Sequence, residues 1–350
     1  MALKTIFLCG HQSRFGLAHL KPVLEEFNVL AVVIATDERW AIFRNKLSGE
    51  SYDTQGKLSK CKTRIITQAR QIRLFGKRLF SCNPSPSLDR ICSNRNIPIL
   101  RIYDIKEEAF IEKMKGYGPE LMLSAAYPQI FPKTLLSIPE RGVINFHPSL
   151  LPRCRGAHPH FWSIATGEKL GGVSAHYMTE NIDDGDIVAQ IEFPIDHYYY
   201  EELYQKIVDE TPSLVRQVRL FYENPDNKPV SQDSRKATYY KNEREIHRRI
   251  FWDIMASRTI HNLIRTEQAF CFFRNKKVRI KRADIMTENR NMTNNVRVEN
   301  GTIVDINESG VVVAVTANYL AIHTLSMRGE DLSFDRWVSR NKVCIGEKFN

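Results

Sequence analysis

The chain has 350 residues, a formal net charge of +10 and 43% hydrophobic residues. This length accommodates two domains with cores of their own, and the hydrophobic content argues against a disordered chain. No apolar run is long enough to cross a membrane, and the seven cysteines are scattered without a C-x-x-C pair. We therefore expect a cytoplasmic protein with reduced thiols, no metal and no membrane partner. The positive charge favours nucleotides, phosphates or RNA as partners without choosing among them.

The first 35 residues predict a strand, a helix and a second strand. Residues 5–10 and 29–35 are apolar runs, and residues 17–27 place apolar side chains at helical spacing. This order is typical of a doubly wound α/β sheet. The loop after the first strand lacks the G-x-G-x-x-G pattern, so a dinucleotide site is not predicted.

An unusual basic insert occupies residues 39–87. Between residues 57 and 78 it carries eight lysines or arginines and no acidic residue, and its apolar positions suggest an amphipathic helix. Such a helix is either a solvated surface element or a lid or groove wall that meets an anionic substrate. The sequence leaves both interpretations open.

Strands and helices continue to alternate after the insert. Residues 97–100, 121–126, 172–178 and 187–193 predict strands, and residues 88–94, 107–114 and 201–222 predict helices. A polar segment with two prolines, residues 224–234, is the best candidate for a linker.

A polar cluster follows the short apolar run at residues 142–144. Two prolines and a glycine come soon after this run, so the predicted strand must end there. Asn145 and His147 are two residues apart, which places their side chains on the same side of an extended segment. In open α/β sheets, ligands bind at such strand ends.

A second cluster, at residues 182–187, holds three aspartates within four residues. An aspartate that faces a histidine fixes its tautomer and supports its protonated form. The alternative is a metal site formed by the three aspartates. We favour the first interpretation because the cluster contains no histidine or glutamate as a further ligand.

These two clusters carry a family resemblance. The pattern Asn-x-His-x-Ser-Leu-Leu-Pro-x-x-Arg-Gly at residues 145–156, followed by Asp-x-Gly-Asp at residues 183–186, resembles the folate-dependent formyltransferases. These include methionyl-tRNA, glycinamide ribonucleotide and amino-sugar N-formyltransferases. The resemblance covers residues 95–195 well and returns more weakly at residues 239–325.

The resemblance implies an α/β fold, with a Rossmann-like doubly wound formyltransferase core followed by a small C-terminal β-barrel of the OB type. Short alternating apolar runs between residues 270 and 325 suit such a barrel. The expected division is a catalytic domain at 1–205, a connecting helix and linker at 206–234, the barrel domain at 235–330 and a tail at 331–350.

The resemblance also implies N10-formyltetrahydrofolate as formyl donor and a primary amine as acceptor. Asn145 would donate to the oxyanion, His147 would donate or shuttle a proton, and Asp183 would orient and charge-balance His147. Ser149 lacks the G-x-S-x-G context of a nucleophile and is expected in a shape-holding turn. The expected cofactor-binding residues lie at strand ends and in the two motifs: Ser124, Ala125, Ala126, Tyr127, Gln129, Ser149, Leu150 and Asp186.

The acceptor is expected to be a nucleotide-linked amino sugar or a similar small anionic amine. The first loop lacks the Thr-Pro and Phe-Ala pattern of the methionyl-tRNA formyltransferases, and the basic insert does not match their tRNA-contacting loop. Methionyl-tRNA formylation is the alternative, favoured by the net charge and the C-terminal domain. A non-catalytic folate- or RNA-binding relative is a second alternative, against which the complete set Asn145, His147 and Asp183 argues. A homodimer is left open.

Overall fold

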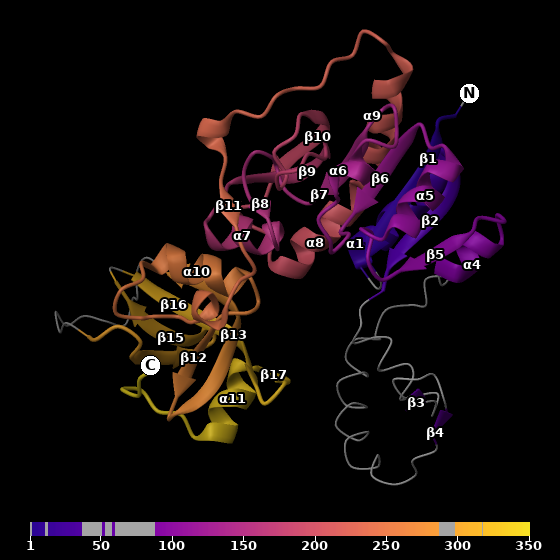
Figure 1. Ribbon diagram of the computed structural model, residues 1–350. Coiled ribbons are helices and arrows are strands. Elements are labelled where there is room, and N and C mark those ends of the chain that lie inside the picture. The colour runs from indigo at the N-terminus through magenta and orange to yellow at the C-terminus, as the bar shows by residue number, and fades with distance from the viewer. Residues whose placement is uncertain are drawn as a thin grey trace. The chain divides into compact units, whose positions relative to one another are not determined.

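The computed structural model describes residues 2–10, 13–36, 88–286, 298–316 and 318–350, with the short strands β3 (Ser51–Tyr52) and β4 (Leu58–Ser59). These residues form two compact units, Met1–Phe146 with Tyr177–Glu180, and His147–His176 with Asn181–Asn350. Figure 1 labels their helices and strands. Apart from β4, the predicted basic helix at residues 57–78 lies outside the described residues. The domain boundaries expected from the sequence stay predictions.

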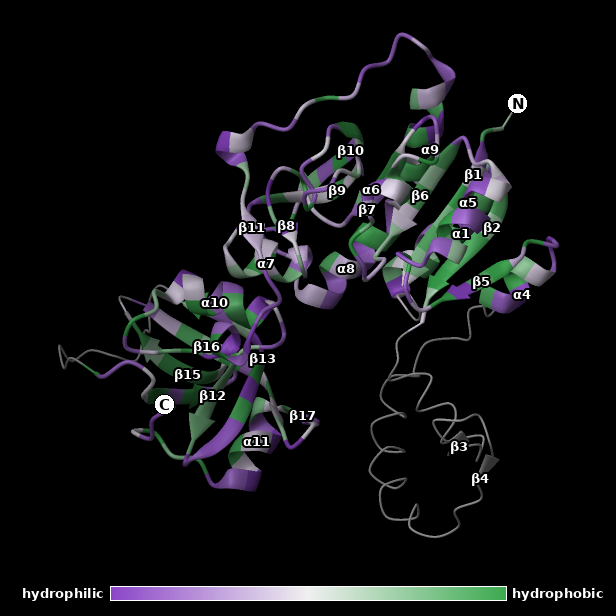
Figure 2. Cartoon of the chain, viewed as in Figure 1, coloured by the Kyte–Doolittle hydropathy of each residue, from purple (hydrophilic) through white to green (hydrophobic). Residues whose placement is uncertain are grey.

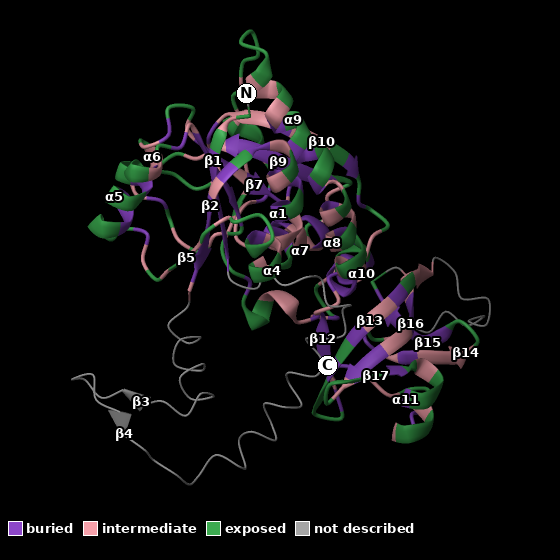
Figure 3. Cartoon of the chain, turned by 90° about the vertical axis from the view of Figure 1, so that its right-hand side faces the viewer, coloured by how far each residue is buried: buried purple, intermediate pink, exposed green. Residues whose placement is uncertain are grey.

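A parallel sheet with the strand order β7-β6-β1-β2-β5 forms the centre of the first unit. Its strands are nearly continuous apolar runs, as expected where helices cover a parallel sheet, and they are green in Figure 2 and mostly purple, for buried, in Figure 3. The strands are β1 (Lys4–Gly10), β2 (Asn28–Ala35), β5 (Ile99–Ile102), β6 (Leu121–Ala125) and β7 (Val143–His147). Helices α1 (Arg14–Glu26), α4 (Leu88–Ser93), α5 (Glu108–Tyr117) and α6 (Lys133–Leu136) lie between them in the chain.

The strand order reverses between β1 and β6, and this switch point is where doubly wound sheets bind ligands. The two strand ends approach each other closely there. A Cβ atom on Gly10 would lie only 2.6 Å from the carbonyl oxygen of Ala126, so a side chain at position 10 is excluded. The predicted doubly wound fold is confirmed.

Helix α1 begins three residues earlier than its apolar spacing predicts. The hydroxyl of Ser13 accepts a hydrogen bond from the Gly16 N–H at 3.0 Å and caps the helix. The sequence thus contains the correct start signal, but it lies outside the apolar repeat.

The first half of the second unit contains an antiparallel strand pair and three helices. The strands are β9 (Leu170–Tyr177) and β10 (Ile187–Pro194), and the helices are α7 (Pro159–Ala165), α8 (Tyr200–Asp209) and α9 (Thr211–Glu223). The single helix predicted over residues 201–222 is wrong, because the structure breaks it at Glu210. Pro212 explains the break, since proline has no N–H and its ring clashes with the carbonyl group four residues earlier.

A two-residue strand, β8 (Arg155–Gly156), pairs in parallel with β11 (Tyr239–Tyr240). Two short 3-10 helices flank β11, η1 (Ser234–Lys236) and η2 (Glu245–Arg248). The predicted linker therefore leads into a segment that packs directly on the loop after β7.

The second half of this unit is an antiparallel sheet with the order β12-β13-β16-β15-β14, with β17 paired to β16. Its inward side chains are buried around Trp252, Trp337 and Phe349. The strands are β12 (Phe270–Phe273), β13 (Lys276–Met286), β14 (Ile303–Asn307), β15 (Gly310–Val315), β16 (Asn318–Met327) and β17 (Glu330–Ser333). Helices α10 (Ser257–Arg265) and α11 (Phe334–Asn341) accompany them.

Residues 331–350, expected as a tail, include helix α11, and their last residues form main-chain hydrogen bonds with the sheet. The Asn350 carbonyl accepts the Phe272 N–H at 2.7 Å, and the Glu347 carbonyl accepts the Ile303 N–H at 2.7 Å. The segment 347–350 thus bonds to β12 on one side and to the start of β14 on the other, which closes the sheet into the predicted small barrel. Phe349 and Trp337 are fully buried with ring centroids 5.6 Å apart, so the hydrophobic effect holds the segment in place. Among the described residues, no helix is both long and apolar enough to cross a membrane.

Candidate active site

Strand β7 delivers two of the predicted catalytic residues. Asn145 and His147 lie two positions apart at its C-terminal end and therefore point to the same side, while Phe146 between them points to the other. Phe146 packs against the buried ring of His19 at 4.4 Å between centroids, which anchors this end of the strand.

His147 is buried, and both of its ring nitrogens have defined neighbours. Its Nε2 lies 2.9 Å from the carbonyl oxygen of Cys154, and because a carbonyl only accepts, Nε2 must carry the hydrogen. Its Nδ1 lies 3.5 Å from Oδ2 of Asp183. In the neutral ring, Nδ1 then presents a lone pair toward a carboxylate. Protonation of Nδ1 converts this unfavourable pairing into an N–H···O contact, so Nδ1 is the atom at which the ring can take up a proton.

Asp183 is held by two further groups. Its Oδ2 accepts a hydrogen bond from the Gly156 N–H at 2.8 Å, and its Oδ1 lies 3.4 Å from Nε2 of His176. His176 is a fully buried residue of β9 that the sequence analysis did not assign to the site. A signal was present, because Ser174 and His176 are polar, alternate along the strand and therefore share one side of it.

The pKa values of Asp183 and His147 are both shifted to lower values. Burial raises the pKa of Asp183, but His147, His176 and the Gly156 N–H lower it by more, so this carboxyl pKa lies well below its usual range. Burial lowers the pKa of His147, and the opposing effect of Asp183 is smaller. At neutral pH the site therefore holds an ionised Asp183 beside a neutral His147.

Ser149 lies in a turn that hydrogen bonds fix both within the turn and to strand β9. Its hydroxyl donates to the Arg153 carbonyl at 2.8 Å, and its own carbonyl accepts from the Ser174 hydroxyl at 2.7 Å. The Leu151 N–H donates to Ser174 in turn, at 3.1 Å. With the hydroxyl engaged and the residue buried, this arrangement shapes the loop and offers no activated nucleophile.

Three aspartates follow β9, and the structure gives two of them different partners. Asp183 faces His147, whereas Asp184 accepts a hydrogen bond from Asn181 at 2.9 Å. In the described part of the chain, no group of three or more histidine, cysteine, aspartate or glutamate side chains could hold a metal ion. The expected absence of a metal stays a prediction.

The residues expected at the cofactor divide between the two units. In the first, Ser124 and Ala125 end β6, and Ala126 has a left-handed backbone with φ of 50°. Burial raises the pKa of the Tyr127 hydroxyl, which has no hydrogen-bond partner among the described residues. Gln129 ties its loop to the end of β5, because its amide donates to the Tyr103 carbonyl at 2.6 Å and accepts the Ile105 N–H at 3.1 Å.

In the second unit, Leu150 and Asp186 are half-buried and Ser149 is buried. The cofactor contacts of all eight residues stay predictions.

Comparison with known families identifies the protein class. A family model for formyl transferases matches residues 73–218, and a model for the formyl transferase C-terminal domain matches residues 244–341. Methionyl-tRNA formyltransferase of Syntrophus aciditrophicus is 32% identical over 274 residues, 75% of this chain and 82% of that protein. The enzyme of the same name from Clostridium novyi is 28% identical over 323 residues, 90% of this chain and 98% of that protein. The chain therefore belongs to the formyl transferase family and is a formyltransferase.

Solved structures share the fold. WlaRD, a sugar 3N-formyl transferase solved with dTDP and 5-N-formyl-THF, has a TM-score of 0.58, 17% identity and coverage of 92% of this chain and 98% of that chain. The Helicobacter canadensis N-formyltransferase, solved with folinic acid and dTDP-3-aminofucose, has a TM-score of 0.59, 15% identity and coverage of 91% and 98%. HypX from Aquifex aeolicus, solved with tetrahydrofolic acid, has a TM-score of 0.51 and 18% identity over 75% of this chain; the chain spans 46% of its length.

Proposed function

We propose that the chain transfers a formyl group from N10-formyltetrahydrofolate to a primary amine, with Asn145, His147 and Asp183 as catalytic residues. The observation that carries this proposal is the unprotonated Nδ1 of His147 facing the ionised Asp183 at 3.5 Å. A folate donor is supported by the folates bound to the solved relatives.

Each catalytic residue has one task. The donor supplies an activated formyl group, whose carbonyl oxygen becomes negative as the amine attacks the formyl carbon. Asn145 donates an amide N–H to this oxygen, a contact typically worth about 2.7–4 kcal/mol in the transition state. His147 accepts the proton of the amine at Nδ1 and becomes an imidazolium that Asp183 stabilises. The imidazolium then returns the proton to the leaving nitrogen, so no covalent bond to the enzyme is needed.

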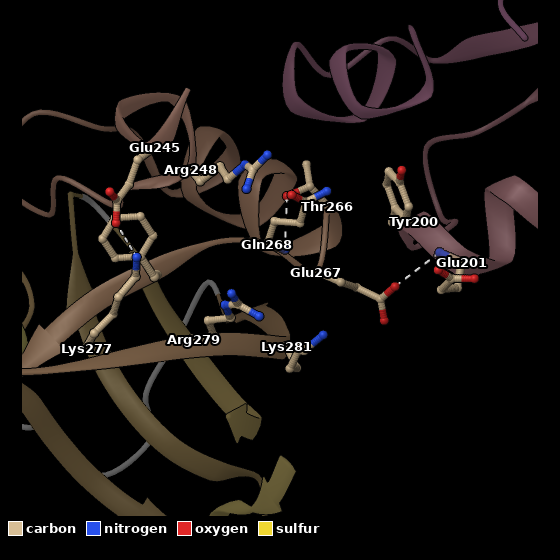
Figure 4. A pocket seen from close by; sticks show the side chains of 11 residues that line it. Tyr200, Glu201, Glu245, Arg248, Thr266, Glu267, Gln268, Lys277, Arg279 and Lys281 are labelled. Carbon is tan, nitrogen blue, oxygen red and sulfur yellow. Dashed lines mark hydrogen bonds and ion pairs between the residues drawn. The ribbon is translucent and has the colours of Figure 1, made fainter. Parts of the chain in front are cut away.

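For the acceptor we propose first a nucleotide-linked amino sugar. A pocket of about 460 Å³ in the second unit has the size of a small-molecule site. Four cationic side chains line it: Arg248, Lys277, Arg279 and Lys281 (Figure 4). Lys277 and Arg279 share one face of β13, and Lys281 follows them at a shift in the strand's register.

The charge of this pocket is only partly balanced from within. Lys277 pairs with Glu245 and Arg248 pairs with Glu243, whereas Glu267 pairs with Arg282, which does not line the pocket. Arg279 and Lys281 have no acidic partner among the described residues, so they are the cations available to a diphosphate. Tyr200 also lines the pocket, and its hydroxyl lies 2.6 Å from Nε2 of His160 in α7, the helix that follows Gly156.

Methionyl-tRNA is the second candidate acceptor. It is supported by the names of the curated relatives, whose similarity extends through the C-terminal domain, and by the net charge of +10. A chain with this charge attracts any polyphosphate, so the charge alone favours neither acceptor.

The two acceptors are separated by initial rates at several salt concentrations. Purified protein with N10-formyltetrahydrofolate is offered a panel of nucleotide-linked amino sugars and, separately, methionyl-tRNA. We expect transfer to a sugar with a shallow salt dependence, because only two phosphates are contacted. For tRNA, log affinity would fall by roughly 0.7 to 0.9 per phosphate contact for each tenfold rise in salt. Efficient tRNA formylation with a steep slope would overturn the sugar proposal, and no transfer to any amine would overturn the formylation proposal.

A further inference from the structure

Asp183 has an unusual backbone conformation. Its φ is 53°, in the left-handed region that residues other than glycine seldom adopt. Such a conformation persists only where the surrounding structure holds it. The direction of the Asp183 carboxylate, and hence its position against His147, depends on whatever holds this backbone.

The side chain of Gln232 fixes this backbone conformation through hydrogen bonds. Its amide nitrogen donates to the carbonyl oxygens of Asp183 at 2.9 Å and Gly185 at 2.7 Å. Its amide oxygen accepts from Nε and Nη2 of Arg155, at 3.1 and 2.8 Å. Both hydrogens and both lone pairs are therefore used. A flipped amide would set like groups against each other on both sides, so the orientation is determined.

Gln232 thereby connects the main chain of Asp183 with the loop that binds the Asp183 carboxylate. On one side it holds the Asp183 main chain, and on the other it holds Arg155, the neighbour of Gly156, whose N–H binds the Asp183 carboxylate. The segment that follows Gln232 forms further hydrogen bonds with residues on either side of Arg155. Thr238 accepts the Cys154 N–H at 2.8 Å, and the Tyr240 carbonyl accepts the Ala157 N–H at 3.0 Å.

We propose that Gln232 is a positioning residue for the reaction, which fixes the backbone of Asp183 so that its carboxylate faces His147. The inference rests on the proposed role of Asp183 in formyl transfer. Gln232 lies in a stretch that the sequence marks only as a linker.

Two substitutions separate the contacts of Gln232. Gln232→Glu keeps the acceptor for Arg155 but removes both donors to the Asp183 loop, whereas Gln232→Met removes all four hydrogen bonds. We expect both to lower kcat by about 10- to 100-fold, the size of effect that follows a small misplacement of a catalytic group. The KM for the donor and the melting temperature should change little. Gln217→Met, at an exposed position of α9, is the matched control and should behave as wild type. A Gln232→Glu enzyme with wild-type kcat would overturn the proposal.

A double-mutant cycle tests whether Gln232 acts through Asp183. In an Asp183→Asn background, Gln232→Met should cost little further kcat, because the group that it positions is already lost. Full multiplicative loss would show an independent structural role and overturn the proposal.

A crystal structure of Gln232→Met gives a readout that does not depend on activity. We expect Asp183 to leave the left-handed region or its carboxylate to move away from Nδ1 of His147. An Asp183 that superposes on its wild-type position would overturn the inference, even if the acceptor has been misassigned. Inactivity of the wild-type enzyme toward every amine would instead count against the proposed function.

Discussion

Nδ1 of His147 and Oδ2 of Asp183 lie 3.5 Å apart, with a hydrogen already committed at the opposite nitrogen of the ring. The pair therefore gains a favourable contact only when His147 takes up a proton. In the proposed mechanism, this pair stabilises the transient imidazolium more than the neutral ring of the resting enzyme, and such a difference is what accelerates a reaction.

Loss of either His147 or Asp183 should abolish this stabilisation of the imidazolium. We expect His147→Ala to lower kcat by about 10²- to 10⁴-fold, the usual contribution of general acid–base catalysis. The double variant with Asp183→Asn should be hardly slower than the worse single variant, because the residues act as a unit. Single-turnover formyl transfer measures this directly, and an His147→Ala enzyme with near-normal turnover would contradict the mechanism.

Asn145 should contribute to catalysis only by donating a hydrogen bond to the oxyanion. We expect Asn145→Ala to lower kcat by about 10²- to 10³-fold, as for other oxyanion donors. The pH profile should keep its shape, because the titrating groups remain. A shifted profile with unchanged kcat would assign Asn145 a different role.

The stability of the protein should fall in acid because His19 is buried and neutral. Burial lowers the pKa of His19 to about 4, against 6.5 for its ordinary value, while a hydrogen bond to the Phe15 carbonyl acts in the opposite direction. Between these values the unfolded chain binds a proton that the folded chain does not, so the free energy of unfolding decreases as pH falls from about 6.5 to 4. The loss attributable to His19 is on the order of 3 kcal/mol.

Urea unfolding at pH 7.5 and pH 5 tests this dependence. His19→Met should be less sensitive to acid than wild type, whereas His197→Met, at an exposed histidine, should retain the wild-type sensitivity. Equal acid sensitivity in the His19 variant and wild type would contradict the argument.

The segment that closes the barrel should contribute strongly to stability. Phe349 is fully buried, so Phe349→Ala should destabilise the protein by about 3–5 kcal/mol. Ile345, two residues before this segment, is 61% exposed, and Ile345→Ala should have a small effect. Thermal unfolding of the two variants gives the comparison, and similar melting temperatures would show that the segment does not hold the barrel.

Substitutions in the cationic pocket should weaken binding of the acceptor and not of the donor. We expect Arg279→Gln with Lys281→Gln to raise the KM for the acceptor several-fold, an effect of about 1 kcal/mol per lost charge-assisted hydrogen bond. Lys276→Gln, on the same strand but outside the pocket, is the control. An unchanged acceptor KM in the double variant would exclude the pocket from substrate binding.

Much of the fold could be predicted from local patterns. The apolar runs predicted the strands of the parallel sheet, and the family motifs predicted the pairing of Asp183 with His147. The barrel-closing segment at 347–350 could not be foreseen in the same way. Phe349 stands between polar residues without any repeat, and its burial depends on partners such as Trp252 that lie far away in the sequence.

Two residues of the candidate active site were equally difficult to predict from local sequence patterns. His176 and Gln232 contact Asp183 or its loop only after the chain folds back on itself, across 7 and 49 positions of sequence respectively. For His176, the only signal is its alternation with Ser174 along β9, and Gln232 lies in no run or spacing that indicates chemistry. The end of helix α8, in contrast, has a local signal, because Pro212 marks a break that the apolar repeat over residues 201–222 does not show.

The pairing of β8 with β11 determines how this enzyme can be divided and recombined. The catalytic family match ends at residue 218, yet Gln232, Thr238 and Tyr240 complete the loop that carries Gly156. A chain cut at that match boundary would keep His147 and Asp183 but lose the groups that align them. In chimaeras that exchange the C-terminal part between relatives, a junction after residue 248 keeps Gln232, Thr238 and Tyr240 in the same chain as the loop they bond to. A junction before residue 232 takes these three residues from the other relative.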